Sequence, residues 1–373
     1  MSLPFSKFAA RAVAGLLLLS TLTSCGGTAA TTPTPSAAPA EPPSPEAQAE
    51  LDAQLGLLSK HITEEERQAA MDLWLQIRPI REARLAAGQW AYRPREESLL
   101  QKLSDLYDQY TIKYLDGDAA GFGYTNPEET TLISYNISED GTLIADPDTA
   151  GQLEGWTEEE LMLLWRDMTE LLPEGAFADF KRLTFFTDGP EETVAWVWQL
   201  DDTGDTWEIA VDPADSGDKR YFVETILHEY CHYLTLNSSQ VTYTSTQTTD
   251  TYNEWGMVSH QGSYIDDFYQ AYWTGYIDDC LSCTDTYNFF LRHYDDFVTA
   301  YASTDPSEDI CEAFTFFVLW PRDPLADQAV WTQKLDFFYA YPELVAFRNQ
   351  VREDLGLSEY QAYEDLFSAA DAA

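Results

Sequence analysis

The sequence predicts an α+β fold in which a small, mainly antiparallel sheet precedes a long helix and a helical C-terminal region. Strand patterns occur at 183–186, 194–200 and 207–211, and the last two flank Asp-Asp-Thr-Gly-Asp, which is typical of a hairpin loop. A run without Pro or Gly then predicts a helix over 220–236. Further helices are predicted over 287–302, 306–319 and 329–369.

Composition excludes two classes of protein. The chain has 373 residues, of which 45% are hydrophobic and 14% aromatic, and this is too apolar for an intrinsically disordered protein. Lys and Arg number 21 against 64 Asp and Glu, a formal net charge of -43. Because such a surface repels phosphate, we expect no nucleic-acid partner and no docking on anionic membranes through basic patches.

Residues 1–24 have the pattern of a signal peptide. Two basic residues precede an apolar run of about 11 residues, which is too short to span a bilayer. The run ends in Leu-Thr-Ser before Cys25, which resembles the lipobox of bacterial lipoproteins. The resemblance implies cleavage before Cys25, a diacylglycerol on its sulfur and a protein anchored in the cell envelope, outside the cytoplasm. An ordinary secreted protein with a chance cysteine is the alternative.

The rest of the chain divides into three predicted regions. Residues 25–50 are rich in Pro, Ala and Thr, which predicts an extended tether. Residues 51–150 are mainly helical, with a helix start at Thr63, a break near Pro94 and a hairpin pattern near the end. Residues 151–373 contain the predicted sheet, the long helix and the remaining helices.

The strongest chemical motif is His228-Glu229-Tyr230-Cys231-His232. Two histidines four residues apart share one face of a helix, so both imidazoles can bind one ion, and neutral imidazole suits zinc. The Glu after the first His can hold a water beside the metal, which lowers the pKa of that water toward about 7. The alternative is a core helix with two incidental histidines.

The motif and the strands before it resemble the zincin metallopeptidases. The resemblance implies a twisted sheet and an edge strand, here 207–211, that binds the substrate backbone by strand addition. A third ligand is also implied. The metzincin extension would place Gly at position 235 and His at 238, where this chain has Thr235 and Ser238. That subclass is therefore excluded.

A later segment resembles the gluzincin pattern, and in particular the family of the anthrax lethal factor catalytic domain. It supplies Glu308, then Glu312 within an "EAF" ending, and Tyr301 seven residues before Glu308. The resemblance implies Glu308 as the third zinc ligand, Glu312 as the partner of a ligating His and Tyr301 as an oxyanion donor. Three alternatives stay open: Glu312 as the ligand, Glu308 as a helix-capping residue only, and Tyr301 as a packed aromatic.

Four cysteines follow Cys25. Cys280 and Cys283 could close a small disulfide or form half of a zinc site, although no second CxxC completes one. Cys231 and Cys311 lie one in each half of the predicted site. A disulfide between them and two buried free thiols are both compatible with the sequence.

These observations predict a membrane-anchored, extracytoplasmic metallopeptidase with one Zn²⁺ per chain. Glu229 is the predicted general base, and the substrate is a protein or peptide. The 22 Tyr and 11 Trp also suit a catalytically silent surface lipoprotein of zincin fold that binds peptides or glycans. A pure binding protein has no need of Glu229, however, and a structural zinc site would require a fourth protein ligand.

Overall fold

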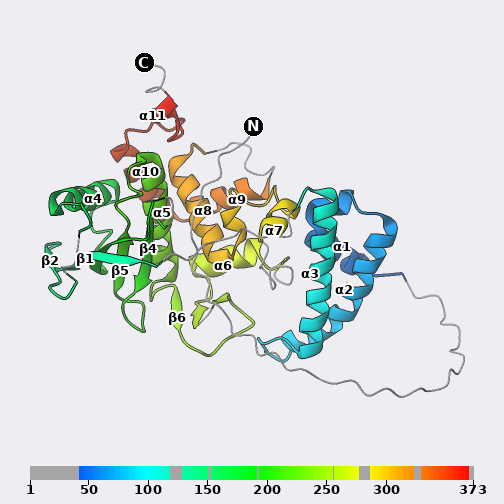
Figure 1. Cartoon of the computed structure of the whole chain (residues 1–373). Helices are drawn as coiled ribbons and strands as arrows, with labels where there is room; N and C mark the ends of the chain where they lie inside the picture. The colour runs from blue at the N-terminus through cyan, green and yellow to red at the C-terminus, as the bar shows by residue number, and fades with distance from the viewer. Residues whose placement is uncertain are drawn as a thin grey trace, which may run out of the picture.

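The computed structural model describes residues 42–117, 128–149, 153–190, 193–254, 256–276, 286–322 and 329–368. The fold is α+β, as the sequence predicts. A mixed five-stranded sheet and a small three-stranded sheet are followed by a helical C-terminal region. The N-terminal helices lie at the opposite end of the molecule from the large sheet, with the helices α6–α9 between them (Figure 1).

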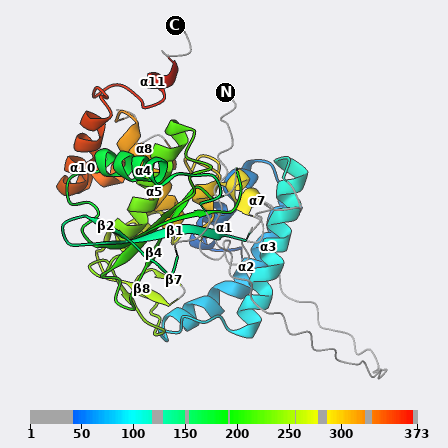
Figure 2. The same ribbon diagram turned by 60° about the vertical axis from the view of Figure 1, so that its left-hand side comes forward.

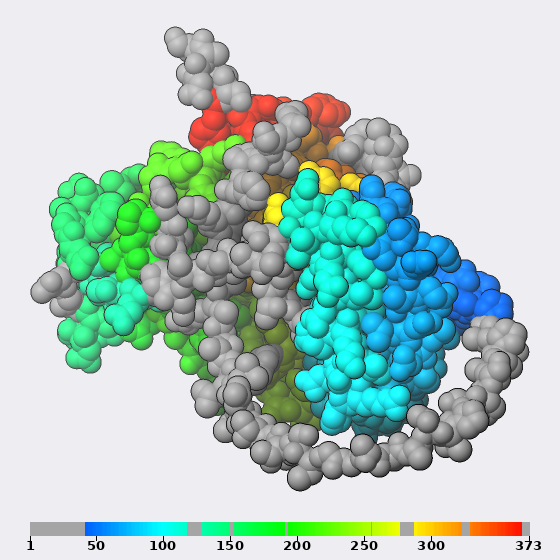
Figure 3. Space-filling view, turned by 45° about the vertical axis from the view of Figure 1, so that its right-hand side comes forward, coloured from blue at the N-terminus to red at the C-terminus, as the bar shows by residue number. Residues whose placement is uncertain are grey.

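The N-terminal region consists of helices and has a hydrophobic core of its own. Its elements are α1 (Pro45–Leu55), a short 3-10 helix η1 (Gly56–Lys60), α2 (Glu64–Leu85) and α3 (Pro94–Tyr114). Thr63 forms the predicted capping box with Glu66, and Pro94 opens α3. In the space-filling view these helices form one block, coloured blue and cyan (Figure 3).

Helix α1 corrects the predicted end of the tether. The chain is helical from Pro45, with Ser44 as the N-cap, and Ala47 is fully buried in the N-terminal core. Glu50 accepts a hydrogen bond from the indole of Trp74. The prolines up to Pro45 led to the prediction of an extended tether. Pro45 occupies the first helical position, where Pro is as compatible with a helix as with an extended segment.

The large sheet has the strand order β2-β1-β3-β5-β4. Its strands are β1 (Thr130–Ile137), β2 (Leu143–Ala145), β3 (Phe180–Thr187), β4 (Ala195–Gln199) and β5 (Trp207–Val211). The β3–β5 pair is parallel and the other three pairs are antiparallel. The predicted hairpin over 130–149 is present as β1 and β2, and it continues the sheet of the C-terminal region by pairing with β3.

The prediction that 207–211 is the edge strand is wrong. Strand β5 lies between β3 and β4, and β4 is the edge strand. The sequence carries a signal for this order, because β5 is apolar at nearly every position and buried on both faces, whereas β4 alternates. The order itself depends on pairing between β3 and β5, which are separated in the chain.

Helix α5 (Lys219–Leu236) follows the sheet and packs against one of its faces, on the same side as α4 (Glu158–Leu171), as Figure 2 shows. Tyr233 of α5 contacts Phe180 and Trp207 of the sheet, with ring centroids 5.0 and 5.7 Å apart. The residues after α5 form β6 (Val241–Tyr243), β7 (Asn253–Glu254) and β8 (Met257–Ser259), ordered β6-β8-β7, and then α6 (Tyr264–Tyr272).

The helices of the C-terminal region follow, and among them α8 packs against α5. They are α7 (Thr286–Arg292), α8 (Pro306–Leu319), α9 (Val330–Phe337), α10 (Pro342–Asp354) and α11 (Asp365–Ser368), with 3-10 turns η3 (Tyr301–Ser303) and η4 (Phe338–Ala340). Helix α8 has the predicted bounds. The helix predicted over 287–302 is shorter, because Asp296 closes a turn onto His293 through both its backbone N–H and its side chain. None of the helices in the described ranges combines the length and apolarity needed to cross a bilayer.

Candidate metal centre

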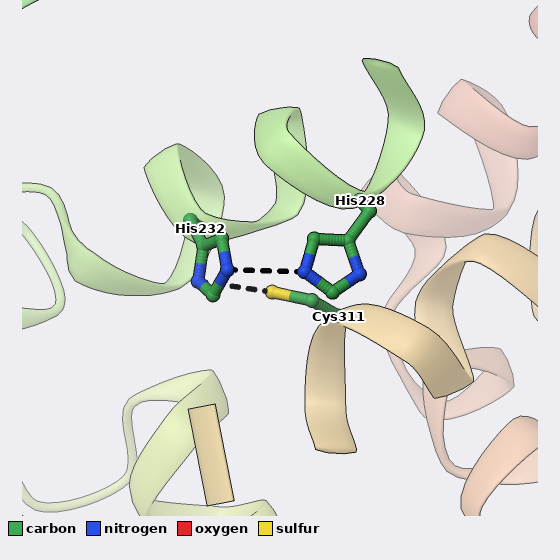
Figure 4. A group of neighbouring side chains, drawn as sticks. All are labelled: His228, His232 and Cys311. Carbon is green, nitrogen blue, oxygen red and sulfur yellow. Dashed lines mark hydrogen bonds between the residues drawn. The ribbon is translucent and has the colours of Figure 1, made fainter. Parts of the chain in front are cut away.

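Helix α5 brings the two histidines of the motif together. Asp218 caps its N-terminus by accepting the N–H groups of Arg220 and Tyr221, and no Pro or Gly interrupts the 18 residues that follow. His228 and His232 therefore lie one turn apart on one face, with their Nε2 atoms 3.2 Å from each other. Figure 4 shows both rings directed away from α5 toward α8.

Glu308 reaches this pair from the first turn of α8. Its Oε2 lies 3.0 Å from Nε2 of His228 and 3.4 Å from Nε2 of His232. Asp305 caps the helix by accepting the N–H groups of Ser307 and Glu308, so the Glu308 side chain is not used as a cap. Ligands bound tetrahedrally at zinc distances are about 3.3 Å from one another, so the three atoms are spaced as zinc ligands would be.

Cys311 lies on the other side of His232. Its Sγ is 3.3 Å from Nδ1 of His232. Figure 4 shows the sulfur directed at the His232 ring. His228, His232 and Cys311 each offer a donor atom within 4.8 Å of the others, and this buried group could hold a metal ion. One imidazole cannot bind the same ion through both nitrogens. An ion beside Glu308 and both Nε2 atoms would therefore leave Cys311 next to the free nitrogen of His232.

Glu312 lies beside Nδ1 of His228, as Cys311 lies beside Nδ1 of His232. Its Oε1 lies 2.9 Å from Nδ1 of His228, and its Oε2 accepts the hydroxyl of Thr299 at 2.6 Å. Both carboxylate oxygens are thus engaged, and neither faces the Nε2 atoms of the two histidines. This bond leaves Nε2 of His228 directed at Glu308 and His232.

Glu229 connects α5 to the edge strand of the sheet. Its Oε2 accepts the backbone N–H of Val197 in β4 at 3.1 Å, and the residue is buried. Burial raises the pKa of the Glu229 carboxyl, while the nearby His232 and His228 oppose that rise. Glu229 therefore lies within the electrostatic reach of both histidines and is held by the strand beside them.

Tyr301 lies in η3, also against the histidines. Its ring centroid is 5.9 Å from that of His228, and its hydroxyl is hydrogen-bonded to Glu308. Burial and then the charge of Glu308 raise the pKa of Tyr301 well above its usual value, so the hydroxyl keeps its proton. Tyr301 can therefore act as a hydrogen-bond donor at this site.

The electrostatic field at the centre attracts positive charge. Burial alone would lower the pKa of both imidazoles, but the carboxylates of Glu308 and Glu312 raise the pKa of His228 well above its usual value. Burial is also the largest influence on His232 and lowers its pKa, but the charge and hydrogen bond of Glu308, together with the charge of Glu229, raise that pKa to about 9. In return, His232 and His228 lower the pKa of Glu308 despite its burial. The field that holds protons on these imidazoles would equally favour a bound dication.

The structure also places residues at the centre that the sequence did not single out. Glu254 of β7 has a pKa of about 8, raised by burial and then by the charges of Asp305 and Glu308. It lies in a short strand with no recognisable pattern. Thr299, in the bend before η3, likewise belongs to no recognisable sequence pattern. The "EAF" ending singled out Glu312, but nothing in it indicated that Cys311 would contact His232.

The other three histidines of the sequence do not join the centre. His260 bonds Thr242 and Ser239, His293 pairs with Asp296, and His61 is exposed at the end of η1. Cys231 and Cys311 are buried free thiols, so the disulfide considered between them is not formed. Burial raises the pKa of Cys311 well above its usual value, and the neighbouring Cys231 adds to the rise. Residues 25, 280 and 283 lie outside the described ranges.

A second group of carboxylates, Asp188, Asp212 and Asp215, lies where β3 and β5 end. Asp212 is buried and accepts the backbone N–H groups of Asp188 and Ala214. Burial raises its pKa to about 6. Hydrogen bonds from an Asp side chain to nearby backbone N–H groups are typical of Asp-rich turns.

No family model, curated protein or solved structure matches this chain.

Proposed function

We propose that the protein is a zinc-dependent metallopeptidase in which His228, His232 and Glu308 hold the ion. The observation that carries the proposal is the triangle formed by the two Nε2 atoms and Oε2 of Glu308, with sides of 3.2, 3.0 and 3.4 Å. Three protein ligands of this type leave a fourth position for water, as in catalytic zinc sites.

The bonds around the triangle support Glu308 over the other candidates for third ligand. Glu312 already uses both oxygens, on His228 and on Thr299. Cys311 faces Nδ1 of His232, whereas Glu308 faces the Nε2 atoms of both histidines. If Cys311 were the third ligand, His232 would have to bind the ion through Nδ1 instead of Nε2.

Glu229 is the proposed general base. When bound, zinc would polarise a substrate carbonyl and lower the pKa of water toward about 7. The burial that raises the pKa of the Glu229 carboxyl makes it a stronger proton acceptor. The N–H of Val197 fixes one oxygen, which leaves the other to accept the water proton and pass it to the leaving amine. Tyr301 is suited to donate a hydrogen bond to the developing oxyanion.

The edge strand β4 is the proposed binding site for an extended peptide. Val194 and Leu200 bond across to β5, through Asp212 N–H to Val194 O and Leu200 N–H to Thr206 O. In an antiparallel pair the intervening odd-numbered residues then direct their backbone groups outward. One of them is Val197, whose N–H reaches Glu229. A substrate strand added along this edge would therefore pass the proposed general base.

We further propose that the enzyme works in the cell envelope, anchored through a lipid on Cys25. This rests on the signal-like residues 1–24 and the lipobox-like sequence that follows. The site would then act on proteins or peptides outside the cytoplasm.

The test is zinc content together with proteolysis, on the full-length chain in detergent beside Glu229→Gln. We expect one zinc per chain in both proteins, and cleavage of a diverse peptide library by the parent chain only. Loss of the base should lower the rate by about 10²–10⁴-fold. One zinc with no cleavage by either protein would favour the peptide- or glycan-binding alternative, and no zinc would refute the metal site.

A further inference from the structure

We propose that Cys311 is a positioning residue that orients His232 for metal binding, with Cys231 fixing the direction of the hydrogen bond between them. The inference rests on the proposed zinc site. The proposed ligands and general base give no role to Cys231 and Cys311, and the inference assigns one to these two buried thiols.

A metal-binding imidazole uses one nitrogen for the ion and donates the N–H of the other to an acceptor. For His228 that acceptor is Oε1 of Glu312, 2.9 Å from Nδ1. For His232 the atom at the equivalent place is Sγ of Cys311, 3.3 Å from Nδ1. The two histidines thus have corresponding partners from consecutive residues of α8, one a carboxylate and the other a thiol.

The surroundings of Cys311 allow its sulfur to accept this bond. Cys311 is hydrogen-bonded to Cys231, and the Cys231 thiol donates to the backbone oxygen of Ile310, with Sγ 3.8 Å from that oxygen. Both cysteines are at most 1% exposed. The His232 N–H can then donate to Cys311, the Cys311 thiol to Cys231, and the Cys231 thiol to the backbone oxygen of Ile310. In this series of three hydrogen bonds every donor has an acceptor.

The charge of the site gives a reason for a thiol in this place. Glu229, Glu308 and Glu312 are already within or beside the centre. A further carboxylate at His232 would add a buried negative charge, whereas a thiol is a neutral acceptor. The bond also connects α5 to α8, the two helices that carry the proposed ligands.

The experiment compares the full-length parent chain with Cys311→Ala, Cys311→Ser and Cys231→Ala. Zinc affinity is measured by competition with a chelator, and thermal unfolding of the metal-free proteins checks that each is folded. We expect Cys311→Ala to weaken zinc binding by about 10–100-fold, the usual cost of losing the partner of a ligating histidine. Cys311→Ser should recover most of the affinity, because its hydroxyl can accept the same N–H. Cys231→Ala should have a smaller effect than Cys311→Ala.

Val318→Ala is the matched control, since Val318 is a fully buried residue of the same helix that is not among the site residues. It should unfold at lower temperature yet bind zinc within about 3-fold of the parent chain. If Cys311→Ala binds zinc as the parent does, or if folded Cys311→Ser binds as weakly as Cys311→Ala, the positioning role is refuted.

Cobalt substitution separates positioning from ligation. We expect no sulfur-to-cobalt charge-transfer band in the parent protein. Such a band, lost in Cys311→Ala, would make Cys311 a ligand and overturn the inference while leaving a metal site in place. Failure of the parent chain to bind zinc or cobalt would instead refute the proposed function itself, and with it this inference.

Discussion

The N-terminal helices and the candidate metal centre both bury charged side chains, but they neutralise them in different ways. In the N-terminal core, Nε of Arg84 lies 2.9 and 3.0 Å from the two oxygens of Glu96, which is fully buried. Nη1 of Arg84 donates to the backbone oxygens of Gln89 and Trp90. Among the described residues, no Lys or Arg forms such an ion pair with Glu229, Glu308 or Glu312 at the metal centre.

Helix α8 contains both arrangements in adjacent residues. Asp309 pairs with the buried Lys334 at 2.6 Å and accepts the indole N–H of Trp273 at 2.7 Å. Among the residues that the structure describes, the partners of Glu308, one position earlier, are imidazoles and a tyrosine hydroxyl. A buried carboxylate with a Lys or Arg partner is complete without a ligand, whereas carboxylates facing imidazoles are best neutralised by a cation. The comparison therefore separates buried carboxylates that have a Lys or Arg partner from those that face imidazoles.

The largest expected effect is on stability, from breaking the buried pair of Arg84 and Glu96. Arg84→Met should destabilise the protein by about 3–5 kcal/mol in urea unfolding, because Glu96 would be left as an uncompensated buried charge. The double variant Arg84→Met/Glu96→Leu should recover most of this loss. Zinc content should stay at the parent value in both. Loss of zinc would mean that the two regions are not independent, contrary to the comparison.

Glu308→Gln should act on metal binding. We expect zinc affinity to fall by more than about 100-fold, beyond the usual cost of losing an outer partner, because a charged ligand is lost. Asp309→Asn is the control from the neighbouring position. It should destabilise the protein by breaking the pair with Lys334, yet keep zinc affinity within about 3-fold. Equal zinc affinity in parent and Glu308→Gln would instead favour Cys311 as the third ligand.

Removal of zinc should affect only one of the two regions. A ligand at 100 times its Kd stabilises the native state by about 2.7 kcal/mol, so chelation should lower the free energy of unfolding by that amount. Hydrogen exchange should locate the loss of protection in α5 and α8 and leave α2 and α3 unchanged. Equal loss in both regions would show that they unfold as one unit.

Asp212 provides the smallest and most specific test, because it is buried and bonded to backbone N–H groups without an ion pair among the described residues. Burial raises its pKa from 3.8 to about 6, so the folded state binds this proton more tightly than the unfolded chain. The associated stability is present below about pH 4 and is lost as the pH rises to about 6.

Asp212→Asn cannot lose this proton. Between pH 4 and pH 7 the stability of the variant relative to the parent should therefore rise by about 1–3 kcal/mol. Urea unfolding at both pH values measures the change. A difference that does not vary with pH would show that the carboxyl titrates normally in the folded protein.

Local patterns predicted most helices and the centre of the site. Thr63, for example, begins a helix as expected. The four-residue spacing in α5 brought the two imidazoles together without reference to the rest of the chain. Glu308 was found only through the resemblance of a distant segment. The sequence left open whether its side chain would cap α8 or face the histidines.

The sequence by itself determined the α+β class and the histidine pair, because helical periodicity and helix caps act over a few residues. The tertiary structure decided that β4, not β5, is the edge strand beside Glu229, because strand order depends on pairing between distant segments. The tertiary structure also decided which side chain contacts each ring nitrogen of the two histidines. Glu308, Cys311 and Glu312 lie within five residues of α8, and only the packing of α8 against α5 assigns each of them a different partner.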